Sequence, residues 1–214
     1  MFADRGEAGR KLAEKLTQEF AEQSLVKDSG LVLAIPRGGI VVGKEISQRL
    51  NLPLEVLITK KIPAPNNPEL AVGAVGEGGV VYLDKELCRN LCLTKVFLKK
   101  IIAEKNKELE LKKEFFRKDQ PFLNLQGKRL ILADDGVATG ATILAAVRVV
   151  RKFKPKEIVV AIPVVALDTL TKLEQEADRV IYLEAPEMFF SVDQFYKNFD
   201  QVSDGQVIKI LASR

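Results

Sequence analysis

Short, largely apolar runs alternate along this chain with longer segments in which apolar residues recur every three or four positions. The runs are residues 31–35, 54–59, 80–83, 130–133, 158–162 and 180–183. A strand without polar alternation must be buried on both faces, which is typical of a parallel sheet covered by helices on both sides. We therefore expect an α/β fold with a central twisted parallel sheet, in one domain of 214 residues.

The spacing of apolar residues also predicts the covering helices. We expect helices from Asp4, over 40–50, 94–118, 140–153 and 168–177, and from about Asp204. Residues 60–79 interrupt the alternation, because prolines, asparagines and glycines are concentrated there. This composition predicts a loop, which we expect to be mobile.

The chain contains no histidine. Its absence excludes Ser-His-Asp and Cys-His catalysis, histidine-ligated zinc and imidazole as a general base. Any chemistry must therefore use carboxylates, cations, hydroxyls and backbone amides. We interpret Cys88 and Cys92 as small, half-buried side chains rather than a metal or redox pair, because zinc needs four ligands and no further cysteine exists.

The net charge is +4, which suits a polyanionic small ligand but is too small to indicate nucleic acid. The basic residues of 95–118 alternate with acids, as expected on a solvated helix face. No apolar run approaches 18 residues, and the chain carries a charge by its fourth residue. We therefore expect a cytoplasmic protein with no membrane or nucleic-acid partner.

The strongest site signal follows the apolar run 130–133. It consists of Asp134, Asp135, Gly136, Val137, Ala138, Thr139, Gly140, Ala141 and Thr142. The two glycines allow backbone N–H groups to converge on a tetrahedral anion, and the two threonines add hydroxyl donors. The helix that follows directs its positive N-terminus to the same point. This pattern predicts a phosphate-binding turn.

The two acids before the turn cannot bind that anion, so their natural partners are vicinal hydroxyls or a divalent cation. A phosphate beside a diol is a ribose 5-phosphate. The alternative is a capped helix start, which explains one Asp and one Thr but not two of each. A second glycine-bearing loop, residues 36–39, follows the run 31–35, and if the two strands are adjacent both loops face one crevice.

Residues 130–142 resemble the signature of the type I phosphoribosyltransferases: four apolar residues, two acids and Gly-x-x-Thr-Gly-x-Thr. Similarity to a bacterial branch of that family spans nearly the full chain. Its other segments here are Phe2-Ala3-Asp4-Arg5 with Ala8-Gly9, Pro36-Arg37-Gly38-Gly39, Lys61 with residues 65–74, and Phe195-Tyr196-x-x-Phe199 to Asp204.

The resemblance implies that the protein binds phosphoribosyl pyrophosphate with Mg²⁺ and transfers its phosphoribosyl group to a nitrogenous base, releasing pyrophosphate. Val137, Ala138, Thr139, Gly140, Ala141 and Thr142 would then hold the 5-phosphate. Asp134 and Asp135 would hold the ribose hydroxyls and, directly or through water, the magnesium. Arg37, Gly38, Gly39 and Lys61 would hold the pyrophosphate, and the catalytic residues would be Asp134, Asp135 and Arg37.

The resemblance leaves some features of the expected site open and predicts others. Arg37 could instead be a surface arginine, and only one of Lys60 and Lys61 needs to face the site. Related enzymes often have a non-proline cis peptide in the pyrophosphate loop, which predicts a cis Pro36–Arg37 bond. A homodimer is also implied by the resemblance.

The resemblance further implies a core over about 29–184 and a small hood formed by 1–28 and 185–214. The loop 66–79 would close over the site, unless it is an ordinary connection. Phe189, Phe190 or Tyr196 would stack on the base, although core packing is the alternative for each. No hood motif matches adenine, hypoxanthine, uracil or orotate. The competing class is a non-enzymatic sensor of phosphoribosyl pyrophosphate that binds nucleic acid, but no basic cluster with interleaved aromatics supports it.

Overall fold

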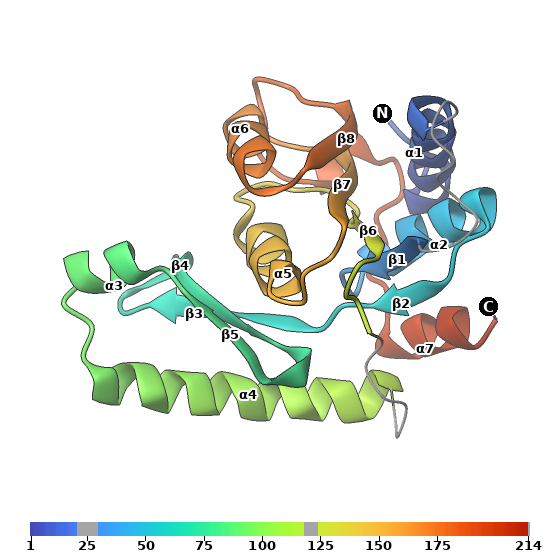
Figure 1. Cartoon of the computed structure of the whole chain (residues 1–214). Coiled ribbons are helices and arrows are strands. Elements are labelled where there is room, and N and C mark those ends of the chain that lie inside the picture. The colour runs from blue at the N-terminus through green and yellow to red at the C-terminus, as the bar shows by residue number, and fades with distance from the viewer. Residues whose placement is uncertain (21–29, 118–123, 214) are drawn as a thin grey trace.

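The computed structural model describes residues 1–20, 30–117 and 124–213. Its main sheet has five parallel strands in the order β2-β1-β6-β7-β8 (Figure 1). The strands are β1 Gly30–Ala34, β2 Leu54–Val56, β6 Arg129–Ala133, β7 Glu157–Val164 and β8 Arg179–Glu184. This arrangement confirms the α/β fold with a central parallel sheet.

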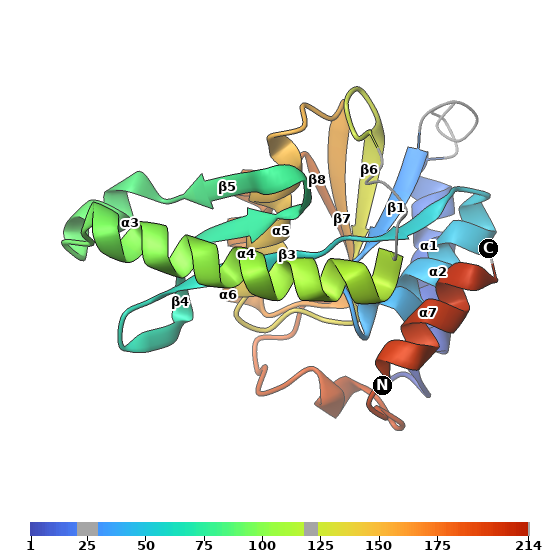
Figure 2. The same cartoon turned by 90° about the horizontal axis from the view of Figure 1, so that it is seen from below.

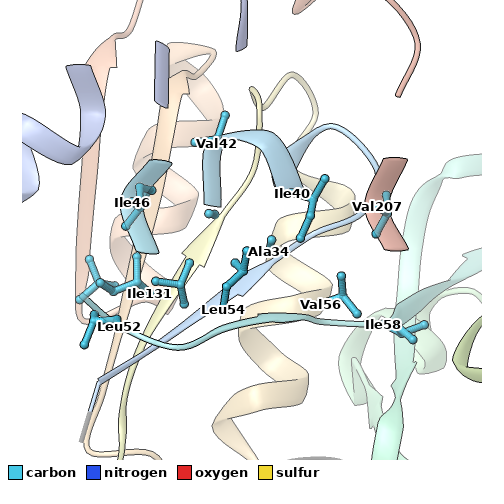
Figure 3. Close-up of a cluster of buried hydrophobic side chains, with 14 of the residues drawn as sticks. Ala34, Ile40, Val42, Ile46, Leu52, Leu54, Val56, Ile58, Ile131 and Val207 are labelled. Atoms are coloured by element: carbon cyan, nitrogen blue, oxygen red, sulfur yellow. The ribbon is translucent and has the colours of Figure 1, made fainter. Parts of the chain in front are cut away.

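Helices cover both faces of the sheet, which explains why its strands are largely apolar (Figure 1). They are α1 Arg5–Phe20 and α2 Gly39–Leu50 on one face, and α5 Ala141–Arg151 and α6 Leu167–Glu176 on the other. Along β1, Val32 packs on the side of α1 and α2, whereas Leu33 packs on the side of α5 and α6. Figure 3 shows the hydrophobic cluster on the side of α1 and α2, in which Ile40 and Ile46 of α2 lie over β1 and β2.

Residues 60–79 are not the loop that their composition predicts. They form most of a second, antiparallel sheet in the order β3-β4-β5. Its strands are β3 Thr59–Ala64, β4 Asn67–Gly76 and β5 Val80–Leu83, with a 3-10 turn η1 Glu77–Gly79 between the last two. The loop prediction was wrong because Pro63 lies at a register irregularity, where its missing N–H is tolerated, and Asn66 makes the hairpin turn with a φ of 62°.

The long helix α4 Lys95–Arg117 lies along β3 and β4 (Figures 1 and 2). Its predicted apolar stripe packs into the core as expected. The stripe consists of Leu98, Ile101, Ile102, Leu109 and Phe116. The short helix α3 Lys85–Asn90 precedes it, and α7 Asp204–Ala212 packs against α2 and α4. The predicted end of the long helix, Lys118, is outside the described residues.

The first residues of the chain lie against the segment after β8, the two parts of the chain from which we expect a hood. The Phe2 N–H donates to the Phe195 carbonyl over 2.7 Å, and the Lys197 N–H donates to the Phe2 carbonyl over 2.8 Å. Residues 21–28 of that hood are outside the described part, and α7 packs on α2 and α4 rather than with these aromatic residues. Among the helices that the structure describes, none has both the length and the apolar character needed to cross a membrane.

Candidate functional site

The loops that follow β1 and β6 lie side by side at the carboxyl end of the main sheet. The two strands pair directly, with Ala34 opposite Ala133. From this pair the chain continues outward in opposite directions, to β2 on one side and to β7 on the other. This is a topological switch point, where open parallel sheets bind their ligands. The sheet therefore has the strand order that the expected crevice between the two loops requires.

Two glycines allow the β1 loop to reach the acidic pair. A Cβ on Gly38 would lie 1.8 Å from Asp135 Oδ2, and a Cβ on Gly39 would lie 2.6 Å from the Ala133 carbonyl oxygen. No side chain fits in either place. The predicted cis peptide is present between Pro36 and Arg37.

The turn after β6 surrounds a hollow of about 130 Å³, lined by Asp134 and residues 136–143. Within the part of the chain that the structure describes, the N–H groups of Ala138, Thr139 and Gly140 donate to no protein acceptor. The first N–H groups of α5 have no intrahelical acceptor either. The turn therefore offers both space and free donors, as an anion site requires.

Val137 differs from the rest of the turn. Its N–H donates to the Val164 carbonyl over 2.9 Å, and its carbonyl accepts from the Ala166 N–H over 3.0 Å. Its side chain is buried. Val137 thus fixes the turn to β7, and its N–H is already used within the fold.

Helix α6 supports the turn from behind through Thr169, a residue that the sequence did not single out. The Thr169 hydroxyl donates to the Ala138 carbonyl over 2.6 Å. Gly140 has a φ of 76°, and a Cβ there would lie 2.5 Å from Thr169 Cγ2. Nothing in the local pattern distinguishes this threonine from any other helical residue, because its partner is 31 positions away.

Asp135 is held by residues from both ends of the chain. Arg5 Nε lies 2.6 Å from Asp135 Oδ2, and the two side chains are only 11% and 15% exposed. The Arg5 guanidinium stacks 3.6 Å from the centre of the Phe199 ring. The Tyr196 hydroxyl donates to the Asp135 backbone carbonyl over 2.5 Å. Arg5 and Tyr196 were only parts of the resemblance, yet they position one of the two predicted site acids.

Asp134 lies in a different electrostatic environment. Burial, and then the neighbouring Asp135 carboxylate, raise the pKa of Asp134 well above its ordinary value. The Asp135 N–H donates to Asp134 Oδ1 over 2.9 Å, which fixes the carboxyl group. The ionised form of a half-buried acid beside a second acid is stabilised by a cation or by hydroxyl donors. The pair is therefore arranged for such a ligand.

A larger pocket of about 400 Å³ adjoins the turn. Thr142 lines both hollows, so the two are neighbours. The polar residues of the pocket are Thr59, Lys60, Lys61, Lys105, Glu108, Lys112 and Thr142. Lys60 and Lys61 of β3 both line it, but successive strand residues direct their side chains to opposite faces, and Lys60 is the one that reaches Glu108 of α4. Arg37 is exposed, and its charge helps to lower the pKa of Lys112, after burial and Lys60.

Most charged side chains of α4 are exposed, as expected for a solvated helix face, but three others line the pocket. These are Lys105, Glu108 and Lys112. The alternation could not reveal this, because the pocket exists only where α4 packs along β3.

The three residues expected to stack on the base differ in their exposure and in their packing partners. Tyr196 is buried and packs 5.4 Å from Phe2, centre to centre. Phe189 packs 5.1 Å from Phe195, whereas the Phe190 side chain is 80% exposed. Core packing thus accounts for Tyr196. The expected lid, residues 66–79, is mainly strand β4.

Residues 3–200 match the sequence model of a family described as phosphoribosyl transferase domain. A relative in each of two Mycobacterium tuberculosis strains is 38% identical over 211 residues, which is 99% of this chain and 46% of the relative. Its name is that of a phosphoribosyl transferase whose activity is marked as unproven. The chain spans about half the length of these curated relatives.

Two solved structures are similar to this fold. The crystal structure of TT1426 from Thermus thermophilus has a TM-score of 0.89 and 37% identity, covering 100% of this chain and 98% of that one. The AQ2163 protein from Aquifex aeolicus has a TM-score of 0.52 and 12% identity, covering 85% and 74%. The second similarity shows the fold alone.

Proposed function

We propose, from the premise that this chain belongs to the phosphoribosyl transferase family, that it binds phosphoribosyl pyrophosphate and transfers the phosphoribosyl group to a nitrogenous base. Pyrophosphate is the second product. The observation that carries the proposal is the hollow turn beside the acidic pair, with free N–H groups at Ala138, Thr139 and Gly140. A phosphate and a diol on one ligand match these two neighbouring features.

The 5-phosphate binds in the turn. Its oxygens accept from the free backbone N–H groups and from the hydroxyls of Thr139 and Thr142, both of which are exposed. The start of α5 adds about half a positive charge at the same point. Asp134 and Asp135 then accept hydrogen bonds from the ribose hydroxyls. These hydroxyls are neutral donors, so they add no charge to the acidic pair.

Magnesium fits the acidic pair if the donor supplies further oxygens. Two adjacent carboxylates are ligands that Mg²⁺ prefers, and it usually retains several waters. The described residues contain no group of three or more acidic, cysteine or histidine side chains that could hold a metal alone. The ion would therefore bind with the donor, where it would neutralise charge on the diphosphate.

The reaction needs positioning and charge neutralisation more than a dedicated acid or base. The anomeric C–O bond to pyrophosphate breaks as the bond to the base nitrogen forms, and negative charge grows on the leaving diphosphate. The base nitrogen loses its proton, which is released to solvent or to the pyrophosphate. Lys60 and Lys61 line the pocket beside the turn, and Arg37 is close enough to affect the pKa of Lys112, so these cations would neutralise that charge. Their fixed charges explain how a chain without histidine can do this chemistry.

The acceptor site belongs to the hood. Arg5 and Tyr196 connect the hood to Asp135, so the orientation of the hood is tied to that of the ribose site. An acceptor base would lie between the hood and the ribose site, with its reacting nitrogen toward the anomeric carbon.

A screen for pyrophosphate release tests the proposal. The chain is incubated with phosphoribosyl pyrophosphate, Mg²⁺ and one nucleobase at a time, and products are identified by mass spectrometry. The Asp134→Asn, Asp135→Asn double variant is the negative control. Release with one base, and a product heavier than that base by a phosphoribosyl group, supports transfer. Tight donor binding without turnover for any base indicates a sensor instead.

A further inference from the structure

The pocket beside the turn contains an unusual charge arrangement. One carboxylate, Glu108 of α4, binds two ammonium groups from different elements. Lys60 Nζ of β3 lies 2.8 Å from Glu108 Oε2, and Lys105 Nζ of α4 lies 2.5 Å from Glu108 Oε1. These bonds from Lys105 and then Lys60 hold the pKa of Glu108 below its ordinary value. Glu108 is therefore ionised and occupies the space between two cations.

Lys112 lies one helical turn beyond Glu108 and also lines the pocket. Among the described residues it has no ion-pair partner within 4 Å, although the more distant Asp204 of α7 partly offsets its charge. Burial, followed by Lys60 and Arg37, lowers the pKa of Lys112, while Asp204 and Glu108 oppose this. Lys60, Lys105 and Lys112 thus line the pocket together with a single lining carboxylate. The pocket has an excess of positive charge in partly buried surroundings, where a polyanion gains most.

We propose that Glu108 is a resident counter-ion that a diphosphate-sized anion displaces from Lys60 and Lys105, and that Lys112 binds the incoming anion. A carboxylate bridging two ammonium groups imitates two oxygens of a phosphate, so a ligand with more charge and more acceptors can replace it. The volume of about 400 Å³ leaves room for this exchange. The choice of a diphosphate rests on the proposed function, which supplies such a group next to Thr142.

The exchange predicts opposite effects for two substitutions on one helix. Glu108→Gln keeps the shape but removes the competing charge, so the anion should bind more tightly. Lys112→Gln removes a binding cation, so the anion should bind more weakly. The matched controls are Glu110→Gln, whose lysine partner Lys113 is 3.1 Å away outside the pocket, and Lys107→Gln, which is exposed.

Calorimetric titration with inorganic pyrophosphate, without added metal, tests the proposal. We expect Kd to fall about tenfold in Glu108→Gln and to rise about tenfold in Lys112→Gln, as for one charge-assisted contact. Both controls should match the unsubstituted chain. Equal or weaker binding by Glu108→Gln, in a variant with an unchanged circular dichroism spectrum and Tm, would overturn the counter-ion role. Identical behaviour of Lys112→Gln and Lys107→Gln would overturn the role of Lys112.

A second titration with ribose 5-phosphate separates this inference from the proposed function. Its phosphate is expected in the turn, so all four variants should bind it equally. If no variant binds ribose 5-phosphate while the pyrophosphate pattern holds, the proposed function fails and the counter-ion exchange stands. If ribose 5-phosphate binds and the pyrophosphate pattern is absent, only the exchange is wrong.

Discussion

Asp134 and Asp135 are neighbours in the sequence but have different partners. Asp135 is paired with Arg5, whereas Asp134 is half-buried beside another acid, and its pKa is raised. The sequence could identify both acids because they adjoin the turn in one continuous motif. It could not identify Arg5 as a partner, because 130 positions separate it from Asp135.

The first prediction concerns the cost of ionising Asp134. An acid whose pKa is raised on folding opposes folding at a pH above its ordinary pKa, because the unfolded chain ionises more easily. Asp134→Asn should therefore stabilise the free protein at pH 7 and raise its Tm. It should also abolish ribose 5-phosphate binding, since the amide has one acceptor oxygen in place of two. Thermal melts and calorimetry measure the two effects.

The control for this substitution is Asp193→Asn, at an exposed acid outside the site. It should change neither Tm nor binding. A lower Tm for Asp134→Asn, or unchanged affinity, contradicts this account of Asp134.

The second prediction concerns the ion pair between Arg5 and Asp135. Arg5→Met keeps the aliphatic length but leaves a largely buried carboxylate without its cation, so the free energy of unfolding should fall by roughly 3 kcal/mol. Arg10→Met removes a guanidinium that lies 3.8 Å from the Glu45 carboxylate, on a side chain that is 59% exposed. It should therefore lower the free energy of unfolding by less than about 1 kcal/mol. Urea unfolding measures both. Equal costs would mean that the Arg5 pair is no more important than a surface pair.

At the scale of helices and strands, the structure differs from the sequence prediction mainly around the second sheet. Strands β1, β6 and β7 were predictable because each is a short apolar run with helical spacing after it. The hairpin of β3 and β4 was not, because Pro63 and Asn66 are read as signals for a loop when their neighbours are unknown. In the fold, a register irregularity tolerates one and a tight turn requires the other.

The third prediction tests the turn at the start of α5. Gly140 and Gly79 both have a positive φ, of 76° and 72°, but only Gly140 has a close neighbour, at Thr169. Gly79→Ala should cost roughly 1 kcal/mol of stability through backbone strain alone. Gly140→Ala should cost more and should also weaken ribose 5-phosphate binding, because the turn must move away from α6. Equal unfolding free energies, with intact binding, would contradict this.

The fourth prediction tests whether α4 is packed or solvated. Leu109 is 2% exposed, whereas Leu111 on the same helix is 62% exposed. Leu109→Ala should cost about 2–5 kcal/mol, and Leu111→Ala less than about 0.5 kcal/mol. Denaturant titration compares them. Similar small effects would mean that α4 does not pack along β3 and β4 in solution, and the wall of the lysine pocket would then be lost.

At the scale of the whole molecule, the site depends on a strand order that the chain order does not give. The turn at 134–142 and the loop at 36–39 are almost a hundred residues apart, and they meet because β1 pairs with β6. The apolar runs predicted a parallel sheet but left this pairing conditional. The contact between Phe2 and Phe195 likewise joins two distant parts of the chain, and the hood stays a prediction. The homodimer stays a prediction.

The central claim is that one ribose phosphate occupies the turn and the acidic pair together. A crystal structure of the chain with ribose 5-phosphate tests it most directly. We expect the phosphate in the hollow lined by residues 136–143, within hydrogen-bonding distance of the Ala138, Thr139 and Gly140 N–H groups and the Thr139 and Thr142 hydroxyls. The ribose hydroxyls should face Asp134 and Asp135. An empty turn at saturating ligand, or a phosphate bound only among the lysines of the neighbouring pocket, would contradict the account.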